Sequence, residues 1–183
     1  MKFFIFHGTY GNPEENWFPW LKKELAKHGD VIVPEFPTPE NQSIESWMSV
    51  LSEYDFMFDE DTIFIGHSLG AVLALRKLEI IHTKIKACFL VAGFLGSLNN
   101  PEFDKLNESF FENDFNWDAI HTHCTNFFVY SSDNDPYVDI AKGHQIADFL
   151  KTDLIKIEGA GHFNTAAGYD EFPRLLEDIK KIL

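Results

Sequence analysis

The sequence contains few basic residues for its size. Its 183 residues include 15 Lys and Arg against 29 Asp and Glu, which gives a formal net charge of −14. Such a chain repels the phosphates of nucleic acids and the headgroups of anionic lipids, and no cluster of Lys or Arg offsets this repulsion. We therefore expect neither a nucleic-acid partner nor a membrane partner.

Cysteine and long apolar runs are also scarce. The only two cysteines, Cys88 and Cys124, lack the spacing of a metal or redox pair, and Cys88 lies in an apolar run that predicts a small core residue. The first apolar run, residues 2–6, is too short for the core of a signal peptide or for a membrane span and predicts a strand instead. These absences favour a cytoplasmic protein.

What the chain does contain is a core and a regular alternation of elements. Its 19 Phe and 4 Trp suffice for a core, and no repeat or linker divides residues 1–183, so we expect a single domain. Helical patterns separate the short apolar runs, which predicts an α/β fold whose parallel sheet is covered by helices on both faces. The six predicted strands are residues 2–6, 31–33, 62–65, 87–92, 127–130 and 154–157. Helices are expected from Asn12, after Ser43, from Leu69 to about Ile81, over 140–150 and near the end of the chain.

The third strand leads into the motif Gly66-His67-Ser68-Leu69-Gly70. A serine in a sharp turn between a strand and a helix has a strained backbone and holds its hydroxyl out above the sheet. Strand and helix approach so closely there that the positions two before and two after the serine must lack bulk, hence the glycines. The motif predicts that Ser68 is a nucleophile. The alternative is that Ser68 only caps the following helix.

Two further side chains follow predicted strands and complete a hydrolytic set. Asp135 lies after the fifth strand and His162 after the sixth, so both should emerge at the same sheet edge as Ser68. Acyl transfer by serine needs a base, an acid that orients the base, and donors for the oxyanion. His162 is the candidate base and Asp135 the candidate acid, with Asp133 as the competing carboxylate.

The oxyanion donors should be backbone N–H groups. One is that of Leu69, at the positive end of the helix that follows the serine. The other should come from the loop after the first strand, where Thr9 is the first choice and Tyr10 the second. His7 and His67 are expected to be structural. We expect Tyr10, Phe94 and Leu95 to form walls of the substrate pocket.

Two other features admit more than one interpretation. His121 and His123, followed by Cys124, have ligand chemistry, but no third ligand has a recognisable spacing, so we expect neither a metal nor another cofactor. Residues 93–116 form a connection of unusual length that is rich in aromatic side chains. It predicts either a functional segment, as a pocket wall or a partner surface, or a local satellite core.

With these residues in place, the sequence resembles the small alpha/beta-hydrolases of the retinoblastoma-binding-protein-nine and YdeN type, a family of serine hydrolases. The likeness covers almost the whole chain. It implies a triad of Ser68, Asp135 and His162, a sheet without the first two strands of larger relatives, and no lid domain. Asp139 departs from the proline that many members have there. The resemblance rests on residues 6–11, 16–21, 66–70, 90–94, 131–138 and 161–163.

The sequence therefore predicts a serine hydrolase that acts on small-molecule carboxylic esters with small or medium acyl groups. Two other functions stay open. The fold can serve as a protein-binding module in which the triad is unused, with the aromatic segment from Phe103 to Trp117 as the partner surface. The same triad also fits an amidase or a peptidase, because its residues do not distinguish esters from amides.

Overall fold

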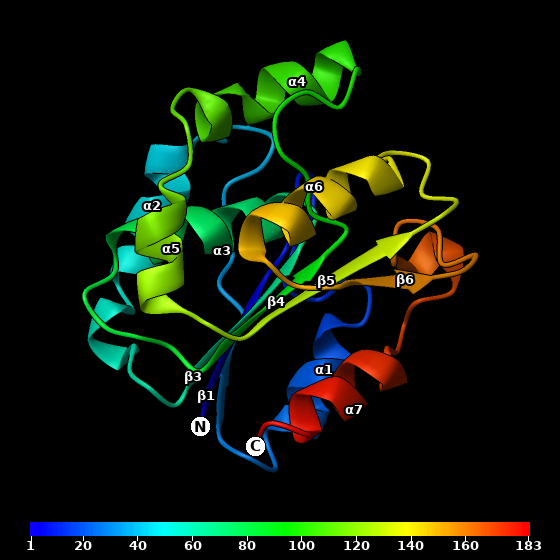
Figure 1. Ribbon diagram of the computed structural model, residues 1–183. Coiled ribbons are helices and arrows are strands. Elements are labelled where there is room, and N and C mark those ends of the chain that lie inside the picture. Colours follow the sequence, from blue (N-terminus) through cyan, green and yellow to red (C-terminus); the bar gives the residue numbers. More distant parts are fainter.

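The computed structural model describes all 183 residues and contains one six-stranded sheet in which every pair of neighbouring strands is parallel (Figure 1). The strand order is β2-β1-β3-β4-β5-β6. It reverses between β1 and β3, the position at which doubly wound sheets bind ligands. The strands are β1 (Lys2–Phe6), β2 (Asp30–Ile32), β3 (Thr62–His67), β4 (Ala87–Val91), β5 (Phe127–Ser132) and β6 (Leu154–Ile157).

Helices cover both faces of this sheet (Figure 1). One face carries α1 (Phe18–Leu25) and α7 (Pro173–Lys180), which contact each other. The other carries α2 (Ile44–Ser52), α3 (Leu69–Ile80), α5 (Trp117–His123) and α6 (Ile140–Leu150). The short helix α4 (Pro101–Asn107) stands apart from the sheet at the top of Figure 1. The predicted α/β architecture is confirmed.

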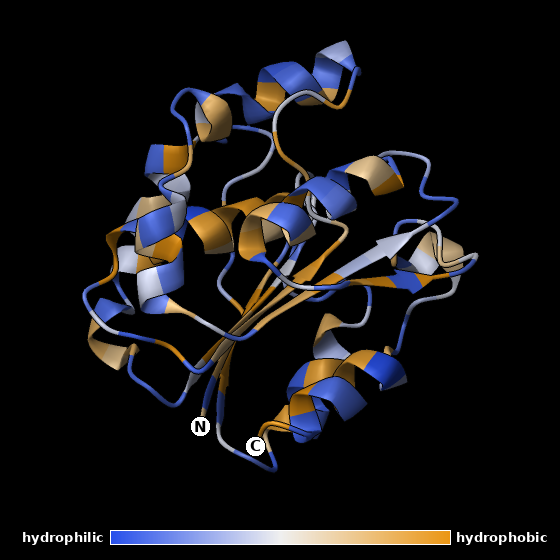
Figure 2. Cartoon of the chain, viewed as in Figure 1, coloured by the Kyte–Doolittle hydropathy of each residue, from blue (hydrophilic) through white to orange (hydrophobic).

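The sheet divides the interior into two apolar clusters. Successive side chains of a strand point to opposite faces, so Phe4 and Phe6 of β1 join one cluster while Phe3 and Ile5 join the other. The central strands are apolar along their length in Figure 2 because both of their faces are covered. Cys88 is fully buried in β4, as predicted.

The prediction that a helix begins at Asn12 is wrong, because α1 begins at Phe18. The Asn12 side chain accepts a hydrogen bond from the Glu14 N–H at 2.9 Å, which closes a turn, and Asn16 has a left-handed backbone with φ of 52°. These two asparagines give the segment a turn conformation until Trp17. By contrast, Ser43 caps α2 as expected, within a reciprocal capping box formed with Ser46.

Residues 93–116 contain α4 and a 3-10 turn, and they serve as both core and wall. Phe110 is fully buried and packs edge-on against Trp47, with ring centroids 5.1 Å apart. Leu98 and Phe103 line a pocket. The expectation that Phe110 belongs to an exposed partner surface is therefore wrong. The helix α5 lies outside the helices expected from the sequence.

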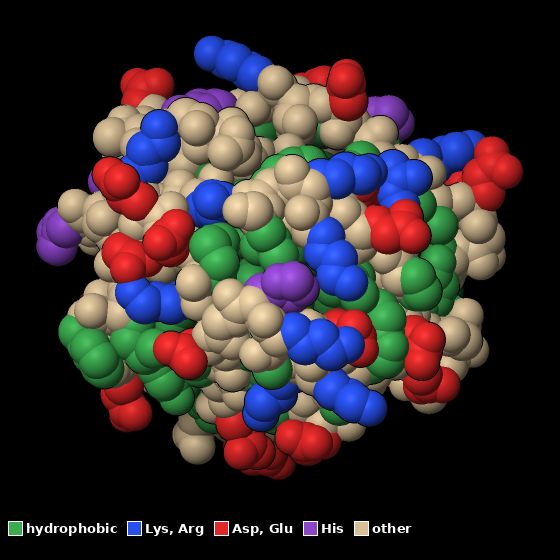
Figure 3. All heavy atoms as spheres, turned by 90° about the horizontal axis from the view of Figure 1, so that it is seen from below, with side chains coloured by type: hydrophobic (Ala, Val, Ile, Leu, Met, Phe, Trp, Pro, Cys, Tyr) green, Lys and Arg blue, Asp and Glu red, His purple; other side chains and the backbone are tan.

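Figure 3 shows the face seen from below, where Lys and Arg side chains lie among Asp and Glu side chains. None of the helices has the length and the apolar character that crossing a membrane requires.

Candidate active site

The backbone of Ser68 is held in a conformation that non-glycine residues rarely adopt. Its φ is 55° and its ψ is −122°, at the point where β3 becomes α3. A Cβ at Gly66 would lie 2.4 Å from the Gly70 carbonyl oxygen, and a Cβ at Gly70 would lie 2.2 Å from that of Phe6. Strand and helix are therefore in backbone contact, as the motif predicts.

The side chain of Ser68 does not cap α3, although the residue occupies the N-cap position. Its backbone N–H donates to the Val91 carbonyl at 2.8 Å, which fixes the turn to β4. The hydroxyl lines a pocket of about 220 Å³. This leaves the hydroxyl free for another role than capping.

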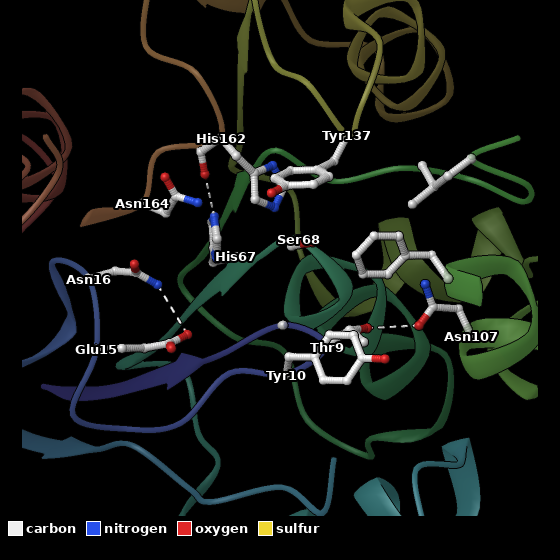
Figure 4. Close-up of a pocket in the computed structure, with 13 residues that line it drawn as sticks. Thr9, Tyr10, Glu15, Asn16, His67, Ser68, Asn107, Tyr137, His162 and Asn164 are labelled. Carbon is white, nitrogen blue, oxygen red and sulfur yellow. Dashed lines mark hydrogen bonds between the residues drawn. The ribbon is translucent and has the colours of Figure 1, made fainter. Parts of the chain in front are cut away.

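Asp135 and His162 meet in a hydrogen bond. The Nδ1–H of His162 donates to Asp135 Oδ2 at 2.7 Å, and the Asp135 carboxylate is 2 % exposed. The other oxygen, Oδ1, accepts from the N–H groups of Tyr137 and Val138 at 2.9 and 3.1 Å. Asp135 thus holds the imidazole with its unprotonated Nε2 available, and His162 lines the same pocket as Ser68 (Figure 4).

The competing carboxylate, Asp133, connects two loops instead. Its Oδ1 accepts from the Gly159 N–H at 2.9 Å, and its Oδ2 lies 3.5 Å from the Lys156 ammonium. The neighbouring side chains of Ser132 and Asn134 accept from Ala160 and Gly161 in the same way. The loop that carries His162 is therefore attached by three hydrogen bonds to the loop that carries Asp135.

The loop after β1 lies directly over the serine. A Cβ at Gly8 would come within 2.8 Å of Ser68 Cβ, so only glycine allows this approach. The Tyr10 N–H already donates to Thr38 Oγ1 at 2.8 Å, while the Thr9 N–H has no partner among the hydrogen bonds of the chain. Together with the N–H of Leu69, the first residue of α3, Thr9 is thus the better of the two candidate oxyanion donors.

The side chain of Thr9 belongs to a network that the sequence pattern does not reveal. Its hydroxyl donates to Asn107 Oδ1 at 2.8 Å, and Asn107 is a buried polar residue at the end of α4. The Gln42 amide donates to Asn107 Oδ1, to the Leu106 carbonyl and to Thr9 Oγ1. Gln42 thereby joins the candidate oxyanion loop to the segment that carries α4. No motif marks an isolated Gln, so only the fold reveals this contact.

The two histidines that flank the site are neutral and structural. His7 accepts from the Phe36 N–H at 2.9 Å, and its Nδ1 lies 2.9 Å from the Gly8 carbonyl. Burial lowers the pKa of His7. His67 lies with its Nε2 2.8 Å from the His162 carbonyl, and burial lowers the pKa of His67 to about 3. A neutral His67 donates this hydrogen bond and holds the backbone of the candidate base, His162.

We expect His67 to make folding stability dependent on pH. Its folded pKa of about 3 lies below its ordinary value of 6.5, so the unfolded chain binds the additional proton. The contribution is therefore fully present above pH 6.5 and is lost as the pH falls, by about 2 kcal/mol between pH 7 and pH 5. Urea unfolding at both pH values measures it. The His67→Gln variant should lose this part of the pH dependence. The control variant His28→Gln changes an exposed histidine and should keep it. An equal pH dependence in wild type and in His67→Gln would contradict the low pKa of His67.

The pocket has two chemically different sides, with Ser68 between them (Figure 4). Polar side chains form one side: Glu15, Asn16, His67 and Asn164. On the other side the ring of Phe103 lies 6.0 Å from that of Tyr10 and 5.8 Å from that of Tyr137, whose ring lies 5.0 Å from His162. Leu98 lines the pocket next to this aromatic row.

Of the expected walls, only Tyr10 lines the pocket. Phe94 is buried in the core with its ring 5.5 Å from that of Phe111, and Leu95 packs against the same core. Leu98 and Phe103, slightly farther along the same connection, take the place foreseen for them. The length of the connection indicates the wall but not which of its residues form it.

The residues with metal-ligand chemistry lie away from this pocket. The ring of His121 contacts the Phe149 carbonyl at 3.0 Å, that of His123 contacts the Leu78 carbonyl at 2.8 Å, and Cys124 is buried. The two histidines therefore have separate backbone contacts, and the cysteine belongs to the core.

The comparisons with known proteins agree with this geometry. The family model described as "Serine hydrolase" matches residues 3–181. The chain belongs to the serine hydrolase family. Within it, the chain is 30% identical to YdeN of Bacillus subtilis strain 168. The alignment spans 173 residues, which are 93% of this chain and 90% of YdeN. The crystal structure of the B. subtilis ydeN gene product matches with a TM-score of 0.92 and 28% identity, over 99% of this chain and 97% of that one.

A second serine hydrolase and a solved esterase are more distant from this chain. Serine hydrolase RBBP9 of Rattus norvegicus is 27% identical over 169 residues, 91% of this chain and 86% of RBBP9. Est1E of Butyrivibrio proteoclasticus, solved with ferulic acid, has a TM-score of 0.67 at 18% identity, over 98% of this chain and 86% of Est1E. The likeness to Est1E concerns the fold. The resemblance seen in the sequence to the YdeN type is thus confirmed.

Proposed function

We propose that this serine hydrolase cleaves carboxylic esters with small or medium acyl groups through an acyl-enzyme. The observation that carries the proposal is the hydrogen bond from His162 to the buried Asp135, in the same pocket as the strained Ser68. The candidate nucleophile and the candidate base thus line one cavity, and the candidate acid holds the base by a buried hydrogen bond. Among proteins with this fold, Est1E binds ferulic acid, a small carboxylic acid of the kind that ester cleavage releases.

The chemistry follows from the geometry. Ser68 Oγ attacks the ester carbonyl while His162 Nε2 takes its proton, and the negative oxygen is stabilised by the N–H groups of Thr9 and Leu69. The tetrahedral intermediate collapses, His162 returns the proton to the leaving alcohol, and Ser68 keeps the acyl group. Water, deprotonated by His162, then attacks the acyl-enzyme and releases the acid. Asp135 stabilises the imidazolium in both halves of the reaction.

The experiment compares p-nitrophenyl butyrate with butyryl p-nitroanilide, together with labelling by a fluorophosphonate. These two substrates share the acyl group and differ in the bond that breaks. We expect labelling and a higher kcat/KM for the ester than for the anilide. A higher kcat/KM for the anilide would indicate an amidase. A folded protein that is not labelled and cleaves neither substrate would contradict hydrolysis and favour a binding module on this fold.

A further inference from the structure

The pocket contains one carboxylate that the proposed reaction does not use. Glu15 is the sole acidic side chain that lines it, and no Lys or Arg lines it. Glu15 takes part in none of the ion pairs of the chain. Its oxygens accept from the side-chain amides of Asn16 at 3.1 Å and Asn12 at 3.5 Å, which are neutral groups. The charge is therefore incompletely compensated.

The surroundings of Glu15 confirm that no positive charge faces it from the chain. Partial burial raises the pKa of Glu15, and the hydrogen bonds from Asn12 and Asn16, which lower it, do not cancel this effect. The neighbouring His67 stays neutral, since burial lowers its pKa to about 3. A half-buried carboxylate that lacks a cation makes folding less favourable, and a cationic ligand removes that cost when it binds.

The same carboxylate is held firmly in place. The Asn16 side chain accepts from the Thr165 N–H at 3.0 Å, and the Trp17 indole donates to the Phe163 carbonyl at 2.9 Å. Both bonds attach the segment of Glu15 to the loop of His162. On the opposite side, a Cβ at Gly11 would lie 2.7 Å from Glu15 Oε1, so the loop after β1 also confines the carboxylate. Figure 4 shows Glu15 and Asn16 on the polar side of Ser68.

We propose that Glu15 binds a positively charged nitrogen of the substrate, so that the preferred esters carry an ammonium group on the polar side of Ser68 and an apolar group against Leu98, Phe103 and Tyr137. The proposal rests on the ester hydrolysis proposed above. An ammonium group reaches this position from either half of an ester, as an amino alcohol or as an amino acid. Both halves present the same chemistry to the carboxylate, and the two must be distinguished by substrate pairs.

The first experiment measures binding without turnover. Chemical shifts of the backbone amides of Asn16 and Asn164 are followed by NMR while n-butylammonium, or its neutral counterpart n-butanol, is added. We expect butylammonium to bind about tenfold more tightly than butanol, as a partly desolvated ion pair allows. Glu15→Gln should remove this difference while keeping an amide oxygen that accepts from Asn16. Glu14→Gln, which removes the same charge from an exposed neighbouring position, should preserve it.

The second experiment measures kcat/KM on pairs of similar shape that differ in charge. Butyrylthiocholine is compared with 3,3-dimethylbutyl thiobutyrate, and p-nitrophenyl 3-aminopropanoate with p-nitrophenyl butanoate. We expect wild type to prefer the cationic substrate about tenfold in one of the two pairs, and we expect this preference to disappear in Glu15→Gln. The pair that shows the preference identifies whether the acid or the alcohol of the ester carries the nitrogen. In Glu15→Gln the kcat/KM of the neutral esters should fall by a smaller factor than that of the cationic esters, and in Glu14→Gln both should stay within about twofold of wild type.

The two experiments separate this proposal from the proposed function. Equal binding of butylammonium and butanol, or an equal loss of affinity in Glu15→Gln and Glu14→Gln, overturns the role of Glu15 whether or not esters are cleaved. A decrease of charged and neutral kcat/KM by the same factor in Glu15→Gln also overturns it and indicates a positioning role. Cation binding that depends on Glu15, without any ester cleavage, supports the cation site and contradicts the hydrolase.

Discussion

The Ser68→Ala variant is expected to cleave p-nitrophenyl butyrate about 10⁴- to 10⁶-fold more slowly than wild type, in terms of kcat, and to lose all labelling by a fluorophosphonate. The alanine removes the atom that forms the acyl-enzyme, so neither His162 nor Asp135 has a nucleophile left to activate. Residual turnover should come from the oxyanion donors and from substrate positioning. Steady-state kinetics at high enzyme concentration and mass spectrometry of the labelled protein measure the two effects.

The stability of the same variant is a second readout. Because the Ser68 side chain makes no capping hydrogen bond, its removal should leave the free energy of unfolding within about 0.5 kcal/mol of wild type. A serine that caps a helix would cost about 1 kcal/mol when replaced by alanine. Unchanged turnover together with a loss of this size would contradict the nucleophile assignment and restore the capping role.

The Asp135→Asn variant is expected to lower kcat for the same ester by about 10³- to 10⁴-fold. The reason lies in the two backbone N–H groups, those of Tyr137 and Val138, that donate to Asp135 Oδ1. They require an acceptor at this position, so the oxygen of the introduced amide has to face them and its NH₂ group has to face His162. The imidazole must then accept through Nδ1 and carry its proton on Nε2, where it cannot take the proton of Ser68.

Asp133→Asn is the matched control for this prediction. It removes the same charge two residues earlier, from a carboxylate that is 38% exposed and whose backbone contact with Gly159 an amide oxygen preserves. Its kcat should stay within about threefold of wild type, because an exposed pair with Lys156 contributes little. Equal decreases in the two variants would show that the loop as a whole, rather than the Asp135–His162 bond, determines the rate.

The sequence predicts the fold well where the pattern is strongly periodic. All six strands are predicted, with ends that shift by one or two residues, because buried parallel strands are continuous apolar runs. The sequence fails to predict helix ends and short helices that depend on local turns and caps rather than on the spacing of apolar residues. Asn16 delays α1 to Phe18, and α5 is a short helix whose N-cap is Asn116, with a side chain that accepts from the Ala119 N–H. Apolar spacing alone does not reveal such caps.

The residues of the candidate site likewise fall into those that the sequence predicts and those that it does not. Ser68, Asp135 and His162 can be found because each follows a strand, and topology brings strand ends together. Gln42 and Asn107 are not predicted because their contacts join segments far apart in the chain, and Glu15 is not predicted because only the fold places it beside Ser68. Phe94 and Leu95 show the same limit, since the long connection indicates a wall but its register is decided by the packing of Phe110 and Phe111.

The Gln42 amide joins a wall of the pocket to the loop of the candidate oxyanion donor. It bonds both Asn107, at the end of α4, and Thr9, whose N–H faces the developing negative charge in the proposed reaction. A displacement of α4 and a displacement of the loop of Thr9 therefore both strain hydrogen bonds of the same side chain. In the proposed reaction, this wall of the pocket and the oxyanion donor are therefore not independent of each other.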